Sequence, residues 1–188
     1  MAPGRVGDDH TPPRSGAAIH HAPLALTADH PNIARVRAYA AERGVELVVK
    51  RFAATTRTAE DAAREIGTEV RRIVKSLVFI ADGRPVLVLC CGDNRVSVKR
   101  LEDLLRARSV RRATADEAKA HTGFPIGGVP PFAHARSLDV IADQTLARFD
   151  RVWAAAGLPD AVFEIAREDL ERLTGARRAA IAAIPGME

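Results

Sequence analysis

One lysine in an apolar segment has the clearest chemical potential in this sequence. Lys75 lies within the run from Ile73 to Ile80, where apolar residues flank it on both sides. A lysine in such a segment must pair with a partner, extend its ammonium group to the rim, or face a ligand. Partial desolvation would favour contact with an anion, such as a phosphate or a developing oxyanion. The alternative is an edge-strand lysine whose ammonium group reaches water, and residue chemistry favours neither interpretation.

The segment from Gly123 to Phe132 combines three glycines and three prolines with little polarity. Glycine allows a close approach of ligand to backbone, and proline holds the shape of a loop fixed. Such a loop can present backbone N–H groups to a substrate without any charged side chain. Its spacing matches neither a dinucleotide-binding fingerprint nor a phosphate-binding P-loop. A rigid surface connection is the alternative interpretation.

Three further features are candidates for a pocket. Asp143 and His134 lie among apolar residues, where they are either polar pocket groups or a capping carboxylate and a structural histidine. The run Ala154 to Gly157 consists of small residues after an apolar strand. It could leave room for a substrate or pack closely against a neighbouring element.

Several other chemistries are excluded. Cys90 and Cys91 are adjacent, so they cannot connect distant segments, and Cys90 in an apolar strand is expected to be buried and inert. Scattered histidines beside two adjacent cysteines do not reproduce the spacing of zinc ligands. No GxSxG element of a serine hydrolase is present. The cysteine usage favours a reducing, cytoplasmic location.

Composition restricts the class of protein further. The chain has 188 residues, 47% hydrophobic and 28% charged, which is typical of one folded domain. No apolar run approaches the roughly 20 residues needed to cross a bilayer. Aromatic residues are only 4%, which disfavours modules that stack successive bases on exposed rings. A formal net charge of +4 permits binding to a polyanion without requiring it.

These residues must be positioned by alternating helices and strands. The patterns predict helices over 31–44, 58–67, 101–105, 114–121 and 167–173, and strands over 45–52, 73–80, 85–91, 137–141, 151–155 and 161–166. Asp82-Gly83 predicts a hairpin between the second and third strands. The irregular order predicts a single compact α+β domain over residues 30–188, with a mixed, largely antiparallel central sheet flanked by helices. Residues 1–29, rich in Pro, Gly, His and Asp, predict a flexible arm without a signal peptide.

Taken together, these segments resemble the YbaK-like prolyl-tRNA editing family. The resemblance covers residues from about 32 to 184 in order, and it is carried by Thr58–Ala63, Ile73–Phe79, Val86–Leu89, Gly92–Val96, the Gly123–Pro131 loop, Val152–Gly157 and Asp169-Leu170. It implies a deacylase that hydrolyses amino acids wrongly esterified to tRNA, with no metal or other cofactor.

The resemblance also implies roles for particular residues. Lys75 matches the essential lysine that holds the terminal adenosine phosphate or the substrate, and Gly127 to Pro131 match a Gly-x-x-x-Pro loop whose backbone holds the ester carbonyl. The implied catalytic groups are Lys75, Gly127 and Gly128. The implied substrate-binding residues are Phe52, Thr58, Ser76, Val129, Pro130, Pro131, His134, Asp143, Ala155, Ala156 and Gly157. Relatives often have glycine just before the histidine, whereas this chain has Ala133, preceded by Phe132.

The expected activity is therefore trans-editing. The substrate would be a small amino acid, such as alanine, cysteine or 2-aminobutyrate, mischarged onto tRNA(Pro), and its own ribose hydroxyl would assist hydrolysis. The acceptor end of mischarged tRNA is the expected partner, and prolyl-tRNA synthetase is an optional second partner. The protein would be a monomer or a weak homodimer. The alternative is a non-catalytic module that binds a tRNA end or a synthetase.

Overall fold

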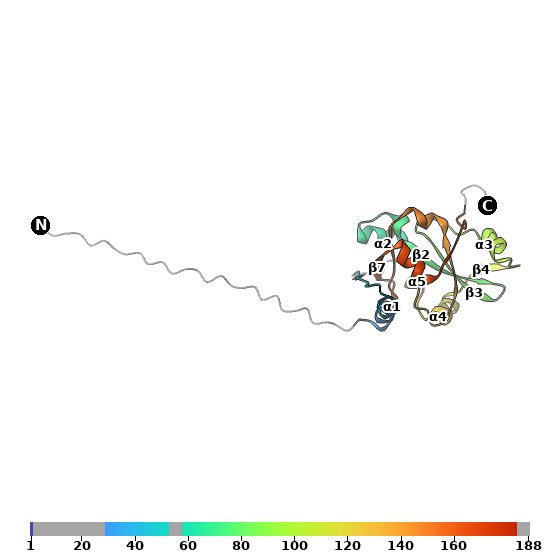
Figure 1. Cartoon of the computed structure of the whole chain (residues 1–188), viewed down its shortest axis with the longest axis horizontal. Helices are drawn as coiled ribbons and strands as arrows, with labels where there is room; N and C mark the ends of the chain where they lie inside the picture. Colours follow the sequence, from blue (N-terminus) through green and yellow to red (C-terminus); the bar gives the residue numbers. More distant parts are fainter. Residues whose placement is uncertain (2–28, 53–57, 184–188) are drawn as a thin grey trace.

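The structure, a computed structural model, describes Met1, residues 29–52 and residues 58–183 (Figure 1). The expected N-terminal arm therefore lies almost wholly outside the described residues. The five α-helices are α1 (Pro31–Ala41), α2 (Ala59–Ile66), α3 (Val98–Leu105), α4 (Ala115–Thr122) and α5 (Arg167–Thr174), with short 3₁₀ helices η1 (Val70–Arg72) and η2 (Gln144–Arg148). None of these helices is long and apolar enough to cross a membrane, within the part of the chain described.

The strands form two sheets. The larger has the order β4-β2-β3-β5-β8, built from β4 (Val110–Arg112), β2 (Val74–Ala81), β3 (Arg84–Cys91), β5 (Asp139–Asp143) and β8 (Arg177–Ala179). The smaller has the order β1-β7-β6, built from β1 (Val49–Arg51), β7 (Ala161–Ala166) and β6 (Arg151–Ala155). The larger sheet is mixed, because β5 runs parallel to both β3 and β8. The prediction of a single α+β domain with a mixed sheet is confirmed, with the strands divided between two sheets.

The β2–β3 hairpin is the longest pairing among the described strands. Its register runs from Val74 opposite Cys91 to Ala81 opposite Arg84. Asp82 and Gly83 have φ values of 45° and 81°, as a two-residue turn of this hand requires. The predicted hairpin is confirmed, and it fixes the position of Lys75 opposite Cys90.

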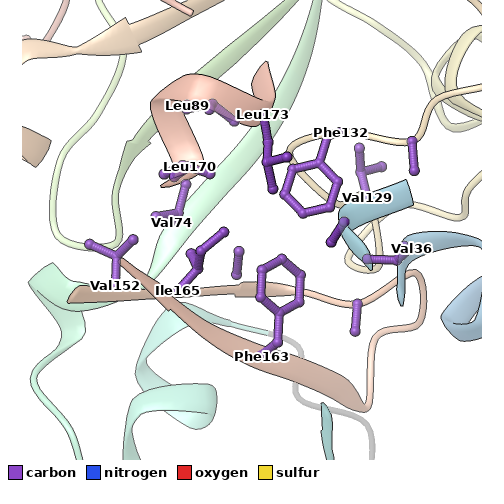
Figure 2. Packing of buried hydrophobic residues seen from close by; sticks show 14 of the residues in the cluster. Val36, Val74, Leu89, Val129, Phe132, Val152, Phe163, Ile165, Leu170 and Leu173 are labelled. Atoms are coloured by element: carbon purple, nitrogen blue, oxygen red, sulfur yellow. The ribbon is translucent and has the colours of Figure 1, made fainter. Parts of the chain in front are cut away.

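Side chains of β2 and β3 alternate between two cores. Val86 and Val88 pack with Leu101 of α3 on one face. Leu87 and Leu89 belong to the larger core on the other face, which includes residues of α1, α4, α5 and the small sheet. Figure 2 shows part of this larger core, where Phe163 of β7 and Phe132 lie among side chains from both sheets. Because one core takes residues from both sheets, the two sheets form one folded unit.

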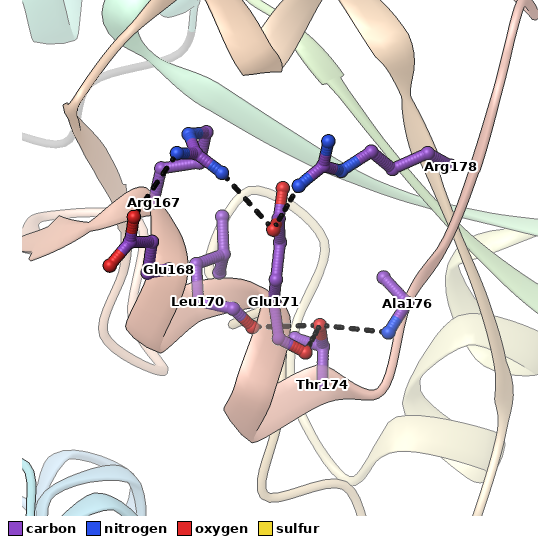
Figure 3. A network of polar contacts seen from close by, with 7 residues as sticks. All are labelled: Arg167, Glu168, Leu170, Glu171, Thr174, Ala176 and Arg178. Carbon is purple, nitrogen blue, oxygen red and sulfur yellow. Dashed lines mark hydrogen bonds and ion pairs between the residues drawn. The ribbon is translucent and has the colours of Figure 1, made fainter.

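The C-terminal helix α5 is tied to β8 by charged side chains (Figure 3). The Glu171 carboxylate accepts a hydrogen bond from Arg167 at 3.2 Å and one from Arg178 at 2.6 Å. Thr174 Oγ1 donates to Leu170 O at 2.7 Å and accepts from the Ala176 N–H at 3.2 Å. These contacts hold the turn that carries the chain from α5 into the edge strand.

Most predicted elements are present, but the first helix ends earlier than predicted, at Ala41, α3 begins earlier, at Val98, and four strands differ. The strand predicted over 45–52 is limited to Val49–Arg51, although Val45 and Leu47 before it are buried. The strand predicted over 137–141 lies at Asp139–Asp143. Strands β4 and β8 were not predicted, since each has three residues with mostly exposed arginines and gives no alternating apolar signal.

Candidate functional site

A cavity of about 380 Å³ lies beside the first half of β2. Six of the residues predicted for the site line it: Thr58, Lys75, Ser76, Gly127, Val129 and Ala155. The rest of its wall is largely aliphatic, with Leu77, Val78, Ala113, Ala118, Ile126 and Ala154 among its members. The cavity therefore joins the lysine strand and the glycine–proline loop, which lie some fifty residues apart in the sequence.

The cavity exists because β2 has a partly open edge. The two sheets meet at a single parallel bridge between Ile73 and Trp153, and β4 pairs only with Phe79 to Ala81. Between these points, Val78 O accepts a hydrogen bond from the Ala113 N–H at 2.9 Å. Because peptide groups alternate in direction along a strand, the N–H and C=O of Ser76 face this same edge. Within residues 29–52 and 58–183 no strand pairs with this stretch of edge, which borders the cavity.

Lys75 is oriented by a backbone carbonyl. Its Nζ donates a hydrogen bond to Asn94 O, in the turn that follows β3. By alternation Lys75 shares its face of the sheet with Leu77 and Phe79, whereas Ser76 points to the opposite face. Both residues nevertheless line the cavity.

A buried carboxylate stabilises that turn. Asn94 Nδ2 donates to Asp143 Oδ2 at 2.7 Å and lies 2.8 Å from Thr145 Oγ1. The Thr145 hydroxyl donates to the same carboxylate oxygen at 2.5 Å. Asp143 is only 1% exposed and does not line the cavity. It contacts Asn94, whose carbonyl oxygen accepts the hydrogen bond from Lys75.

The hydroxyl group of Ser76 is buried at the edge of the cavity. Its Oγ is buried and has no hydrogen-bond partner among the described residues. A buried hydroxyl without a partner costs free energy, on the order of 1–3 kcal/mol. Since Ser76 lines the cavity, a polar group of a bound substrate can supply the missing partner.

The glycine–proline loop presents one of its two predicted catalytic glycines to the cavity. Gly127 lines it, with a φ of 84°. Gly128 is buried behind the lining, and its N–H donates to Pro125 O at 3.0 Å, which closes the turn. A Cβ atom at Gly128 would lie 2.7 Å from the Leu158 backbone. Gly128 thus permits the close packing that positions Gly127.

His134 supports the loop from behind. Its Nε2 lies 2.8 Å from Pro130 O, which makes Nε2–H the donor, and its ring meets Phe124 edge to face. Burial lowers the pKa of His134, so the ring is neutral near pH 7. Ala133 adopts a φ of 64°, the conformation that glycine favours, so the loop keeps this shape without the glycine of relatives.

The remaining predicted residues lie outside the cavity lining. Pro130 and Pro131 are buried within the loop. The Phe52 N–H donates to Asp160 O at 2.8 Å, and the Ala156 N–H donates to Ala161 O at the same distance. Gly157 O accepts from Asn32 Nδ2 at 3.0 Å, against α1. Ala156 and Gly157 are buried, so the chain enters the core directly after β6 and these two residues do not line the cavity.

Besides the aliphatic wall, three polar residues at or near the site were not predicted. Glu60 and Arg112 line the cavity, and Asn94 holds Lys75. Arg112 lies in the unpredicted strand β4, with its guanidinium 5.6 Å from the centre of the Phe79 ring. Among 28 basic residues a single arginine gives little signal, and Asn94 is recognisable only from the fold.

The cysteines are not reactive groups of this site. Burial raises the pKa of Cys90 to about 12, and burial also raises the pKa of Cys91. Both thiols stay protonated at neutral pH, so neither is a nucleophile. Within residues 29–52 and 58–183, no three His, Cys, Asp or Glu side chains gather as a metal-binding group.

The chain is similar in sequence and in fold to several known proteins. The sequence model of the aminoacyl-tRNA editing domain matches residues 53–173. A Bacillus subtilis protein, the uncharacterized YwhH, is 31% identical over 140 residues, covering 74% of this chain and 88% of its own. A solved structure described as a proposed trans-editing enzyme for prolyl tRNA synthetase is 39% identical, with a TM-score of 0.79 over 84% of this chain and all of the other.

Proline–tRNA ligases carry a similar segment. That of Lactobacillus helveticus is 37% identical over 112 residues, covering 60% of this chain but only 20% of the ligase. The matched part of this chain thus spans only about a fifth of the length of the ligase. The match to the family model over most of the folded chain, together with the cavity between Lys75 and the glycine–proline loop, shows that the protein belongs to the aminoacyl-tRNA editing domain family.

Proposed function

We propose that the protein is a trans-editing deacylase that hydrolyses the ester between a small, mischarged amino acid and tRNA, with tRNA(Pro) as the preferred tRNA. The observation that carries this proposal is the single cavity bordered by both Lys75 and Gly127. An ammonium group suits the phosphate of the terminal adenosine, and an exposed loop backbone suits the ester carbonyl. The solved relative described as a proposed trans-editing enzyme supports the choice of tRNA(Pro).

In the proposed reaction a water molecule attacks the ester carbonyl carbon. One proton of this water passes to the oxygen of the neighbouring ribose hydroxyl, which gives its own proton to the ester oxygen of the ribose as the bond between that oxygen and the carbonyl carbon breaks. The products are a free amino acid and an intact tRNA. The protein contributes orientation and stabilisation of the developing oxyanion, for which the Gly127 backbone is the candidate donor.

Small residues in the cavity wall support a small aminoacyl group. Ala113, Ala118, Ala154 and Ala155 contribute only methyl groups to the lining. A pocket of this kind discriminates by about 10–200-fold per methylene, mainly by excluding what is too large. The unpartnered Ser76 hydroxyl is the candidate contact for the amino group or ester of the substrate.

The decisive experiment is a panel of tRNA(Pro) charged with alanine, cysteine, 2-aminobutyrate or proline. The purified protein should release at least one of the three smaller or non-cognate residues much faster than proline. A total lack of deacylation across the panel would contradict the proposal. Saturable binding of tRNA without hydrolysis would instead support the non-catalytic module.

Lys75 provides the matching variant. Lys75→Ala should lower kcat/KM by about 10²-fold or more, comparable to the loss of one transition-state donor, without changing the melting temperature appreciably. Lys99→Ala is the control, because Lys99 is an exposed lysine on α3. Full activity in Lys75→Ala would remove this ammonium group from the mechanism.

A further inference from the structure

A second concave surface lies at the other end of the larger sheet. It is a groove of about 420 Å³, where Ala81 and Val86 lie beside Leu104 and Leu105 of α3. Its polar lining consists of Arg84, Arg106, Asp139 and Arg177. Ala81 and Lys75 lie at opposite ends of β2, about 20 Å apart at the rise of an extended strand. The groove is thus distinct from the editing cavity.

Strand register places these charges on one face. Arg84 lies two residues before Val86 and therefore on the same side of β3. Asp139 is opposite Val86, and Arg177 is opposite Ile141, which lies on that same side of β5. Val86 and Ile141 pack against α3. The chain therefore brings three distant segments to the point where α3 ends.

The groove has an excess of positive charge. Arg84, Arg106 and Arg177 are exposed, and none has an ion-pair partner within 4 Å in the described part of the chain. Asp139 is the single carboxylate in the lining. Many other exposed arginines in this protein are paired, as Arg111 is with Glu117 at 2.7 Å. Three unpaired guanidinium groups around one groove are suited to phosphate oxygens.

The backbone conformation of Arg106 is a second, independent feature of the groove. It ends α3 in the left-handed conformation, with a φ of 52°. The other left-handed helix ends among the described helices, after α2, α4 and α5, are all glycines. Glycine adopts this conformation with less strain, so arginine at this position is unfavourable for the fold. Strained residues of this kind are frequent at binding sites.

We infer that this groove binds backbone phosphates of the tRNA acceptor stem while the aminoacyl end occupies the editing cavity. The inference rests on the proposed function for the identity of the RNA, and its ligand chemistry is the phosphate group. At about 20 Å from Lys75, the groove meets phosphates of the stem and not those of the terminal nucleotide. Phosphate contacts of this kind position an RNA without reading its sequence.

The test measures binding of uncharged tRNA(Pro) at several salt concentrations. The double variant Arg84→Ala/Arg177→Ala should weaken binding by about tenfold or more at low salt, and reduce the slope of log K against log salt by about 1.4–1.8. KM for mischarged tRNA should rise while kcat stays unchanged. An unaltered salt slope would overturn the inference.

A matched control distinguishes the effect of removing the groove arginines from the effect of lowering the net charge. Arg37→Ala/Arg172→Ala removes two exposed arginines from α1 and α5 and changes the net charge equally. It should leave the salt slope close to that of the wild type, and an equal loss would overturn the inference.

A large excess of free pyrophosphate should displace the RNA poorly, because the groove holds several linked phosphates. Ready displacement would instead assign the groove to a free phosphate ligand and overturn the RNA assignment.

Arg106→Gly distinguishes binding from folding. This variant should raise the melting temperature by about 2–4 °C and at the same time weaken tRNA binding. Unchanged binding would contradict a role for Arg106. The binding measurements use uncharged tRNA, so they stay informative even if the protein does not hydrolyse mischarged tRNA. Weakened binding of the variants by a protein without deacylation would support the groove and reject the deacylase. Deacylation together with unaltered binding of the variants would support the deacylase and reject the groove.

Discussion

At Lys75, a neutral carbonyl performs the orienting role that a carboxylate often has. The ammonium group donates to Asn94 O, and Asn94 is itself held by Asp143 and Thr145. A carboxylate in direct contact would neutralise the lysine. A carbonyl restricts the position of the ammonium group and leaves its charge available to an anionic ligand. The buried Asp143 carboxylate contacts Asn94 and not Lys75, and it holds the turn after β3 in place.

Asp143→Asn tests this arrangement at the scale of single residues. The substitution removes the charge that accepts hydrogen bonds from Asn94 Nδ2, the Thr145 hydroxyl and the Thr145 N–H, and we expect about 1–3 kcal/mol lower stability and a kcat reduced by about tenfold. Asp150→Asn, at an exposed position, is the isosteric control.

A double-mutant cycle separates positioning from general damage. If Asp143 acts through Lys75, Asp143→Asn should cause no further loss of kcat in a Lys75→Ala background. Additive losses would show that Asp143 supports the fold without orienting the ammonium group.

At the scale of elements, the loop from Pro125 to His134 owes its shape to close packing. Gly128 lies against the Leu158 backbone, and Phe132 stacks on Tyr39 with ring centres 5.4 Å apart. Phe132 also contacts Phe163, with centres 5.6 Å apart. These contacts explain how Ala133 is held in a left-handed conformation.

Gly128→Ala should therefore damage the site. The new methyl group would lie within 3 Å of the Leu158 backbone, which cannot easily move, so we expect a loss of about 1–3 kcal/mol and a large fall in deacylation. Gly44→Ala is the control, because a Cβ atom there meets nothing within 4 Å. It should cost about 1 kcal/mol through its positive φ and leave activity unchanged. Equal activity of both variants would contradict the role given to the loop.

The loop should also respond to acid through His134. Burial lowers the pKa of His134 in the folded protein below its value in the unfolded chain. The unfolded state therefore binds the proton first, and stability that is present above about pH 6.5 is lost as the pH falls through the lower pKa of the folded state. His134→Gln removes this titration.

Urea denaturation between pH 7.5 and pH 5 measures the effect, as the difference between the wild type and His134→Gln. The wild type should lose more stability than the variant over this range. The same dependence in both proteins would assign the acid sensitivity to other groups.

At the scale of the whole molecule, the two sheets share one core. Phe163 of the small sheet and Leu89 of the larger sheet belong to the same cluster, shown in Figure 2. A common core predicts a single cooperative unfolding transition. Trp153, the only tryptophan, lies in β6 of the small sheet and reports on it directly.

Urea denaturation followed by Trp153 fluorescence and by far-ultraviolet circular dichroism should give coincident curves. Phe163→Leu should shift both curves together, by about 1–2 kcal/mol. Separate transitions for the two probes would show that the small sheet unfolds independently.

Local signals in the sequence accounted for most elements. Thr58 and Thr114 cap α2 and α4, as their spacing to later acidic residues predicted. Strands β6 and β7 have the predicted bounds. The short edge strands β4 and β8 could not be predicted, because pairing with a neighbour and not an apolar pattern makes them strands.

The sequence by itself determined the kind of chemistry: a lysine in an apolar strand and a loop rich in glycine and proline. Only the tertiary structure decided which residues share the cavity. It brings Lys75, Ser76 and Gly127 together, and it places Asp143 and His134 behind them. The physical reason is that hydrophobic periodicity and capping act over a few residues, whereas the cavity arises where two sheets meet at one bridge and then separate.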